Sequence, residues 1–229
     1  MKLLPIKLGI AKKSGNTQKS EKNGPAKSLN DIKPKILERD KNTCRFCAFE
    51  AKKYQEILVI NYNEQDLRPQ NLVTSCIFCH QCFHLDKVSS MRSGALIWCP
   101  ELTQAQINQV TKSVYIARIS QGPMADAARK SLDTLMSRRE DVKTRLGTDD
   151  PYILSTVLRD YLTDKNYKAR TEKLEGVRLL PLDRRIIKEG DLEFNQFPQI
   201  LAYWRSKDGP FGAIPPNKWI ESFAQKFAA

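Results

Sequence analysis

Two pairs of cysteines at identical spacing constrain the fold of this chain more than any other feature of its sequence. Cys44 and Cys47 form one Cys-x-x-Cys pair, Cys76 and Cys79 form a second, and 28 residues separate the pairs. Each pair can place two thiolates on one tight turn, so that both face one ion at about 2.3 Å. The spacing therefore predicts a four-cysteine zinc site. The interval leaves room for a strand pair and a loop, as in a treble clef.

We expect this zinc to be structural, because a closed shell of four thiolates leaves no position for a substrate. Two other interpretations remain open, that the cysteines are ordinary buried residues or that they are redox pairs. The ligand set is also open, since Cys82 or His80 lies close enough in sequence to replace a member of the second pair. We expect Cys99, beside Trp98, to be a small buried apolar residue.

The N-terminus and the hydropathy of the chain predict a cytoplasmic protein. No apolar stretch approaches the roughly 20 residues that span a bilayer. Pro5 and Lys7 interrupt the N-terminus before a signal-peptide core can form. In the cytoplasm thiols stay reduced, which favours metal binding over disulfides for clustered cysteines.

The formal net charge of +12 first suggests a nucleic-acid partner or an anionic membrane face. Residues 1–41 hold eleven Lys or Arg and four Asp or Glu, a net of +7, which leaves only +5 for the rest. Residues 12–28 are rich in Lys, Ser, Gly and Asn and are predicted to be flexible. We therefore expect a solvated basic arm and no specific nucleic acid. Nucleic-acid binding through this arm is the alternative.

Short apolar runs predict strands in the first hundred residues. Residues 57–62 and 96–98 favour strands, and residues 63–71 favour a loop. Residues 3–10 could form a short strand, which Pro5 would restrict to a sheet edge.

The signal becomes helical after residue 103. Thr103 and Gln106 form a capping-box pattern, and apolar residues then repeat at helical spacing through 128–146. Gly147 is a suitable end for that helix, and Asp150 followed by proline predicts the start of the next.

The last 39 residues are rich in aromatic side chains. Eight of the nineteen aromatics lie here: Phe194, Phe197, Tyr203, Trp204, Phe211, Trp219, Phe223 and Phe227. Pro216 could begin a final helix that carries three of them on one side. Such a face suits a groove on a partner. We expect instead that it packs on its own domain, because a soluble protein seldom leaves so much aromatic surface exposed.

Around the cysteine pairs, the chain resembles the HNH endonucleases. The resemblance is carried by Arg39-Asp40, Cys44-x-x-Cys47, an aliphatic strand, and Asn71-Leu72-Val73-Thr74-x-Cys76-x-x-Cys79-His80. It implies a structural zinc beside a ββα-metal catalytic site.

The catalytic part of this motif is altered. The family's general base is a histidine in the central strand, where this chain has Ile60 and Asn61, and neither side chain can deprotonate a water. Asn71 and His80 match the family's asparagine and trailing histidine, and His84 is the only other histidine. We therefore expect a nuclease-like scaffold that is not an enzyme. An HNH-type nuclease or nucleic-acid-binding protein is the alternative.

A more specific resemblance is to the IcmJ (DotN) subunits of type IVB Dot/Icm secretion systems. It covers residues 34–120, weakens through 179–181, and is carried by Ile36-Leu37-Glu38-Arg39-Asp40, Cys76-x-x-Cys79-x-x-Cys82-Phe83 and Pro100-Glu101-Leu102-Thr103-Gln104-Ala105. The resemblance implies a zinc-containing adaptor at the cytoplasmic face of the inner membrane. Such an adaptor binds the C-terminal extension of the coupling ATPase (DotL) and, with the IcmS–IcmW chaperone pair, supports recruitment of effector proteins.

These observations predict an α+β fold with a small zinc-knuckle module, HNH-like or treble-clef-like, followed by a helical region. We expect four parts: a flexible basic segment (1–30), the HNH-like zinc-binding module (31–100), a helical region (101–190) and an aromatic-rich extension (191–229).

Overall fold

Three antiparallel strand pairs lie among the helices in this computed structural model, which describes residues 2–10, 28–63 and 65–219. β1 (Gln55–Val59) pairs with β2 (Leu72–Cys76), β3 (Gly94–Trp98) with β4 (Val177–Pro181), and β5 (Ile186–Glu189) with β6 (Leu192–Asn195). The predicted α+β class is confirmed. Most of the expected basic segment and the end of the expected final helix, at 220–229, lie outside the described residues.

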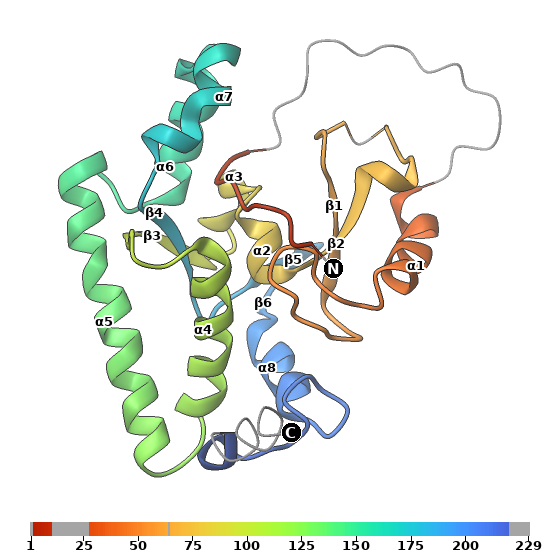
Figure 1. The fold of residues 1–229 in the computed structure, drawn as a ribbon, viewed down its shortest axis with the longest axis vertical. Coiled ribbons are helices and arrows are strands. Elements are labelled where there is room, and N and C mark those ends of the chain that lie inside the picture. Colours follow the sequence, from red (N-terminus) through yellow and green to blue (C-terminus); the bar gives the residue numbers. More distant parts are fainter. Residues whose placement is uncertain (1, 11–27, 64, 220–229) are drawn as a thin grey trace.

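The first helix leads into the cysteine region. α1 (Leu29–Arg39) begins at Ser28, which forms a capping box with Asp31. At its other end, Asp40 accepts the backbone N–H of Thr74 at 2.9 Å. This buried hydrogen bond attaches the end of α1 to β2 (Figure 1).

The β1–β2 pair spans the interval between the two cysteine pairs. Ile57 lies opposite Thr74 and Leu58 opposite Val73. The strand expected at 57–62 is present but shifted to Gln55–Val59. The chain turns at Tyr62, where φ is 59°. Two short helices, α2 (Ile77–Gln81) and α3 (Leu85–Val88), follow β2.

The β3–β4 pair joins distant parts of the chain, with Gly94 opposite Pro181 and Trp98 opposite Val177. The strand expected at 96–98 is confirmed within β3. Two long helices, α4 (Gln104–Arg118) and α5 (Pro123–Leu146), lie side by side, and α5 covers the β3–β4 pair (Figure 1).

The predicted helix ends are confirmed. Gln106 N–H donates to Thr103 Oγ1 at 3.3 Å and closes the capping box of α4. α5 ends at Gly147, whose φ of 75° suits glycine. Asp150 caps α6 (Pro151–Thr156), which continues into a π-helical turn at Val157–Tyr161.

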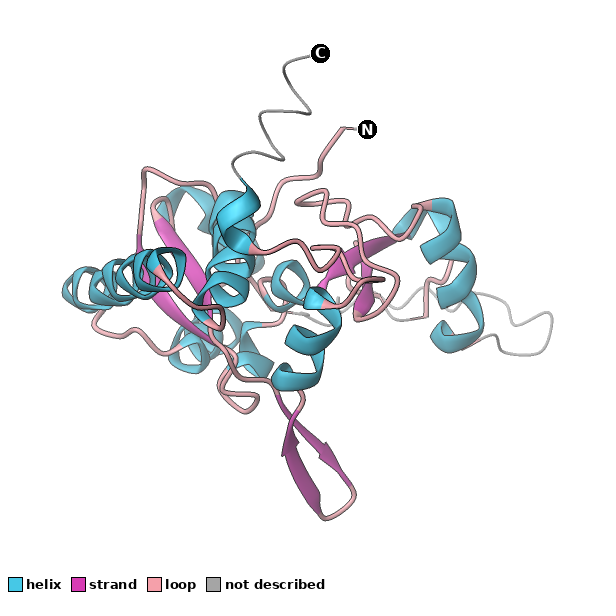
Figure 2. Cartoon of the chain, turned by 90° about the horizontal axis from the view of Figure 1, so that it is seen from below, coloured by secondary structure: helices cyan, strands magenta, loops and turns pink. Residues whose placement is uncertain are grey.

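The helical region is shorter than the expected 101–190. Its last helix, α7, spans Asp164–Lys173, and the strands β4 and β5 then lie within the range expected to be helical. The reason is that Val177, Leu179 and Leu180 are buried in a strand paired with β3. The β5–β6 hairpin extends away from the body (Figure 2).

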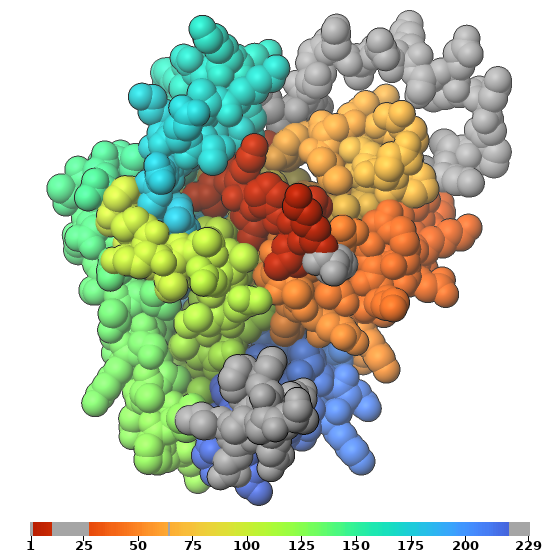
Figure 3. Space-filling model, in the orientation of Figure 1, coloured from red at the N-terminus to blue at the C-terminus, as the bar shows by residue number. Residues whose placement is uncertain are grey.

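The edge strand expected at residues 3–10 is wrong, because these residues join no sheet. They run across the surface between the cysteine region and α7 (Figure 3). Tyr167 Oη accepts the N–H of Ile10 at 3.1 Å and donates to its carbonyl at 2.9 Å, and Arg170 Nε donates to Leu8 O at 2.8 Å. Side chains of α7 therefore satisfy backbone groups that a neighbouring strand would otherwise bond.

The last described α-helix, α8 (Phe197–Arg205), packs into the core, and a 3-10 turn at Pro216–Lys218 follows it where the final helix was expected to begin. Phe197 and Trp204 are buried, and Phe197 stacks on Phe78 with ring centroids 6.2 Å apart. This part of the aromatic extension packs on its own chain, as expected. No helix among the described residues is long and apolar enough to cross a membrane.

Candidate metal centre

Four cysteine sulfurs meet where the two Cys-x-x-Cys turns face each other. The Sγ atoms of Cys44, Cys47, Cys76 and Cys79 all lie within 4.8 Å of one another. The Cys47 and Cys76 sulfurs are 3.7 Å apart. Each of the four residues is at most 1% exposed. The structure thus brings together the residues that the spacing selected.

The first pair lies on a tight turn. Ala48 N–H donates to Cys44 O at 3.0 Å, and Cys44 N–H donates to Phe49 O at 2.9 Å. Ala48 has a φ of 58°, in the left-handed region that reverses the chain. This reversal turns both thiols of the pair inward.

The second pair begins where β2 ends. Cys76 precedes the first residue of α2, and Cys79 lies three residues on, so that the two side chains share one face of the helical turn. The two turns are connected directly, because Arg45 N–H donates to Thr74 O at 2.9 Å.

The donor set and its size fit zinc. Tetrahedral zinc with zinc–sulfur bonds of about 2.3 Å requires sulfur–sulfur separations of roughly 3.8 Å. The Cys47–Cys76 separation of 3.7 Å matches, and the other sulfurs lie within the same small volume. Four soft sulfur donors suit zinc better than magnesium or calcium, which prefer oxygen.

Burial and hydrogen bonds among the sulfurs shift the pKa values of these thiols in opposite directions. Burial raises the pKa of Cys44, whereas a hydrogen bond from Cys44 lowers the pKa of Cys47. Burial also raises the pKa of Cys79. Four thiolates cannot share this volume without a cation, which is the chemical requirement that a bound metal ion would meet.

Helix α4 supplies three polar side chains to this centre. Asn108 Nδ2 donates to Cys79 Sγ at 3.2 Å, and Gln109 Nε2 donates to Cys47 O at 2.8 Å. Lys112 Nζ lies 3.8 Å from Cys47 Sγ. Burial acts to lower the pKa of Lys112, but the surrounding cysteines outweigh it and raise this pKa above its ordinary value.

None of these three residues was predicted from the sequence. For Asn108 and Lys112 a signal was present, because Gln104, Asn108 and Lys112 recur every four residues and so share one helix face. That face is buried. Polar residues on a buried face indicate a polar or charged partner.

The other candidate ligands lie outside the group of four. Cys82 Sγ donates to Phe78 O at 3.3 Å. His80 stacks on His84, with ring centroids 4.4 Å apart. Cys99 is buried with Ile97, Ile107 and Leu180, as expected for a small apolar residue.

Asn61 and Asn71, at positions that resemble the nuclease motif, form hydrogen bonds within the loop that connects β1 to β2. Asn71 Nδ2 donates to Asn61 Oδ1 at 2.9 Å and to Asp66 O at 2.8 Å. Asn61 Nδ2 in turn donates to Asp66 Oδ2 at 2.8 Å. Ile60 is 44% exposed. These amides are occupied in closing the β1–β2 connection.

The two histidines line a pocket of about 440 Å³ with residues of α1 and β1, among them Lys33 and Glu56. Neither Asn71 nor Ile60 lines this pocket. Burial and the nearby charge of His84 hold the pKa of His80 well below its usual value, which makes its imidazole a weak base.

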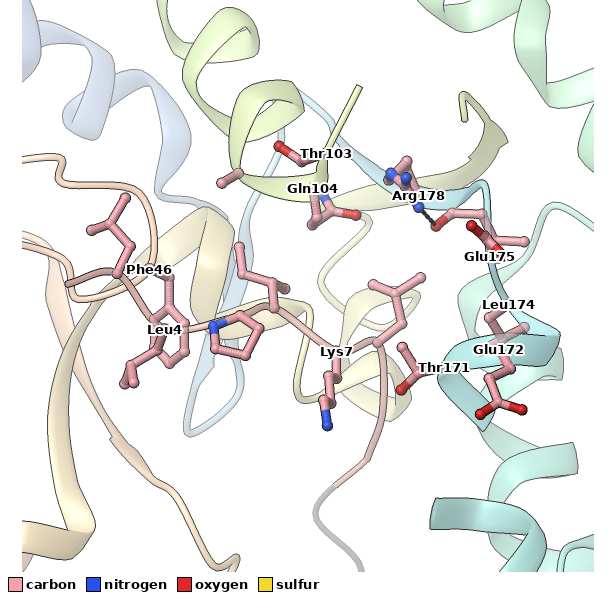
Figure 4. A pocket seen from close by; sticks show the side chains of 16 residues that line it. Leu4, Lys7, Phe46, Thr103, Gln104, Thr171, Glu172, Leu174, Glu175 and Arg178 are labelled. Carbon is pink, nitrogen blue, oxygen red and sulfur yellow. Dashed lines mark hydrogen bonds between the residues drawn. The ribbon is translucent and has the colours of Figure 1, made fainter. Parts of the chain in front are cut away.

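A second cavity, of about 660 Å³, lies between residues 3–8 and the turn from α7 into β4. Figure 4 shows Leu4 and Phe46 on one side of this cavity and Leu174 and Arg178 on the other. No histidine or cysteine is among the described residues that line it. Its apolar lining suits packing of a chain segment better than acid–base chemistry.

Comparison with known proteins identifies one curated relative. The chain is 35% identical over 152 residues to the type 4 apparatus protein DotN of Legionella pneumophila subsp. pneumophila, and the match covers 64% of this chain and 70% of that relative. No protein-family model matches the chain.

Proposed function

The chain belongs to the family of the type 4 apparatus protein DotN, and from this membership we propose that it is a zinc-stabilised, non-catalytic adaptor subunit of a type IVB secretion coupling complex. The observation that carries the proposal is the match over 70% of DotN. The motifs around the cysteine pairs resemble this family, and the match extends that similarity over most of the length of DotN.

The proposed stabilising ion is zinc, with Cys44, Cys47, Cys76 and Cys79 as its ligands. The support is the separation of the four sulfurs and their burial. An ion held by all four thiolates has no open position for substrate, so its contribution is to the fold. The ion would fasten the first turn to β2 and α2, and through Asn108 to α4.

The proposed partner is the C-terminal extension of the coupling ATPase (DotL). Through this partner the chain would lie at the cytoplasmic face of the inner membrane and would cooperate with the IcmS–IcmW chaperone pair in effector recruitment. The support for these partners is the family resemblance.

A non-catalytic role is supported by the nuclease-like region. Asn61 and Asn71 bond to each other and to Asp66, and the pKa of His80 lies well below that of an effective base. The HNH nuclease alternative would require a general base at positions 60–61, where the chain has Ile60 and Asn61 just beyond the end of β1.

A genetic experiment tests the function in the organism that encodes the chain. Deleting the gene is expected to abolish translocation of a reporter-tagged effector, and a wild-type copy is expected to restore it. A Cys44→Ser, Cys76→Ser copy should fail to restore it, and a Cys99→Ser copy is the matched control. Unchanged translocation after deletion would contradict the proposed function.

A further inference from the structure

We propose that residues 4–8 and the cavity beside them form a docking groove, in which an extended segment of a partner protein adds to this chain as a β-strand. The docking groove consists of the backbone of residues 4–8 and the cavity of about 660 Å³ between that backbone and the turn from α7 into β4. The inference goes beyond the proposed function, because it assigns a surface and the chemistry of its occupant. It does not depend on the zinc site.

Residues 4–8 have the form of a strand that lacks a neighbour. None of them lies in a turn or a bend, and none has a positive φ. The burial of their side chains alternates along the segment. Leu4 and Ile6 are half-buried and Leu8 is buried, whereas Pro5 and Lys7 are exposed. A period of two is that of an extended chain with one face on the protein.

Hydrogen bonds fix both ends of this segment. Leu4 N–H donates to Arg45 O at 2.9 Å, and Arg170 Nε donates to Leu8 O at 2.8 Å. A partner strand would therefore meet an edge that the protein already holds in place. Such preorganisation lowers the entropic cost of binding.

Between these ends, one edge of the backbone is unbonded. Among the described residues, no group bonds the N–H groups of Ile6 and Leu8 or the carbonyl groups of Leu4 and Ile6. In an extended chain the backbone groups of alternate residues point to the same edge, so these groups form one row. An unbonded row of this kind is a template for another chain, and main-chain hydrogen bonds give strand addition its affinity.

The cavity has room for side chains of an added strand. Its lining is mainly apolar, with Phe46 on the side of the segment and Leu174 and Val177 on the other (Figure 4). Its volume of about 660 Å³ is within the range of sites that enclose a ligand. Because alternate side chains of a strand point to one face, apolar residues at every second position of the partner would enter the cavity.

The charges around the cavity indicate a further property of the occupant. Glu172 and Glu175 line its α7 side, both are exposed, and neither forms a salt bridge with a described residue. The lining cation on that side, Arg178, is bonded to Leu102 O at 2.6 Å. The occupant is therefore an extended segment with apolar residues at alternate positions and a Lys or Arg side chain that reaches the two carboxylates.

The test begins with the full chain and a library of random dodecapeptides displayed on phage. The selected peptides are expected to share apolar residues at alternate positions and at least one Lys or Arg. One of them is then synthesised with a fluorescent label, and its affinity for each variant is measured by fluorescence polarisation. A library that yields no binder, or binders without the alternation, would overturn the proposal.

Ile6→Pro removes the N–H at the centre of the unbonded edge, and Ile6→Val is the matched control that keeps it. We expect Ile6→Pro to weaken binding by at least about tenfold, because proline cannot donate to a ladder and its ring hinders a paired strand. Ile6→Val should weaken binding by about threefold at most, since it removes one half-buried methylene. Equal affinity of the wild type and Ile6→Pro would overturn the proposal.

A double variant of exposed side chains keeps the proposal testable if Ile6→Pro does not fold. Glu172→Gln with Glu175→Gln should weaken binding by about 2- to 5-fold at low salt and by less at high salt, because exposed charge pairs are weak and screened. Asp133→Asn, at an exposed position of α5, is the control and should change nothing. An unchanged affinity of the double variant at low salt would overturn the proposed occupant.

Hydrogen–deuterium exchange locates the bound peptide on the wild type. Exchange at the amides of Ile6 and Leu8 should slow when the peptide binds. Unchanged exchange at both amides would overturn the proposal. A dimer of the chain that Ile6→Pro dissociates would also overturn it, because a second copy would then occupy the edge. None of these results would contradict the adaptor function, which assigns no face to its partner.

Discussion

Two hydrogen bonds join Asn71 to Asn61. Asn71 Nδ2 donates to Asn61 Oδ1 at 2.9 Å, and Asn71 Oδ1 accepts the backbone N–H of Asn61 at 3.0 Å. In the HNH resemblance, Asn61 lies where the family's general base is expected and Asn71 matches the family's asparagine. Here they close the connection between β1 and β2. The two side-chain amides therefore have a structural role in this connection.

Asn71→Ala is expected to lower the free energy of unfolding by about 1–3 kcal/mol, because it leaves the buried ends of this loop without partners. Chemical denaturation measures the change, and Gln70→Ala, at an exposed neighbouring position, is the control. We also expect no magnesium-dependent nicking of plasmid DNA by the wild type. Nicking that Asn71→Ala or His80→Ala abolishes would revive the nuclease alternative.

The metal ligands give the second prediction. Cys44→Ser or Cys76→Ser should lower zinc content and stability together, with a loss above about 4 kcal/mol, because the binding energy of a structural ion is folding energy. Metal analysis and thermal unfolding measure the two effects. Cys99→Ser, which changes a buried cysteine outside the centre, should keep full zinc content. A stable, metal-free Cys44→Ser chain would argue against a structural site.

Asp40 supports the third prediction. Burial acts to raise the pKa of its carboxyl group, but hydrogen bonds from Arg39 and from Thr74 N–H outweigh burial and lower this pKa. A lowered folded-state pKa contributes stability above the unfolded value of about 3.9, which is lost as the pH falls through the folded pKa. Asp40→Asn should therefore cost about 1–3 kcal/mol.

The pH dependence checks that account. The stability difference between the wild type and Asp40→Asn should be the same at pH 8 and pH 6, because both values lie above the two pKa values of the carboxyl group. Urea denaturation of both proteins at each pH measures it. A difference that shrinks between pH 8 and pH 6 would mean that another group carries the effect.

The basic segment supplies the fourth prediction. Removing residues 1–30 would also remove Leu8 and Ile10, which are buried, so the test changes only the lysines Lys12, Lys13, Lys19, Lys22 and Lys27 to serine. We expect unchanged thermal stability and unchanged binding of the ATPase segment. A wild-type chain that binds nucleic acid with a steep salt dependence, lost in the serine variant, would favour the nucleic-acid alternative.

The sequence predicted most of the features that depend on residues close together in the chain, such as helix ends and cysteine pairs. The capping box at Thr103, the end of α5 at Gly147 and each Cys-x-x-Cys pair depend on residues a few positions apart, so the sequence alone predicts them. The matching spacing of the two pairs then predicted that all four cysteines meet. The pairing of β3 with β4 was not predicted, because the two strands are about eighty residues apart and neither carries a register signal.

Two other features were not predicted correctly for the same reason, that they depend on residues distant in sequence. Residues 3–10 look like an edge strand, but Tyr167 and Arg170, far along the chain, supply their hydrogen bonds. Lys112 looks like a surface lysine in a helix, but its surroundings come from Phe49, Phe78 and the cysteines. In each case a residue distant in sequence sets the environment.

The most direct test of the whole account is co-purification of the chain with the C-terminal extension of the coupling ATPase, followed by metal analysis of the complex. We expect a stable complex that contains one zinc ion per chain. Stripping zinc with a chelator should reduce binding, and adding zinc should restore it. Failure of a folded, zinc-loaded chain to bind the ATPase extension would contradict the adaptor function.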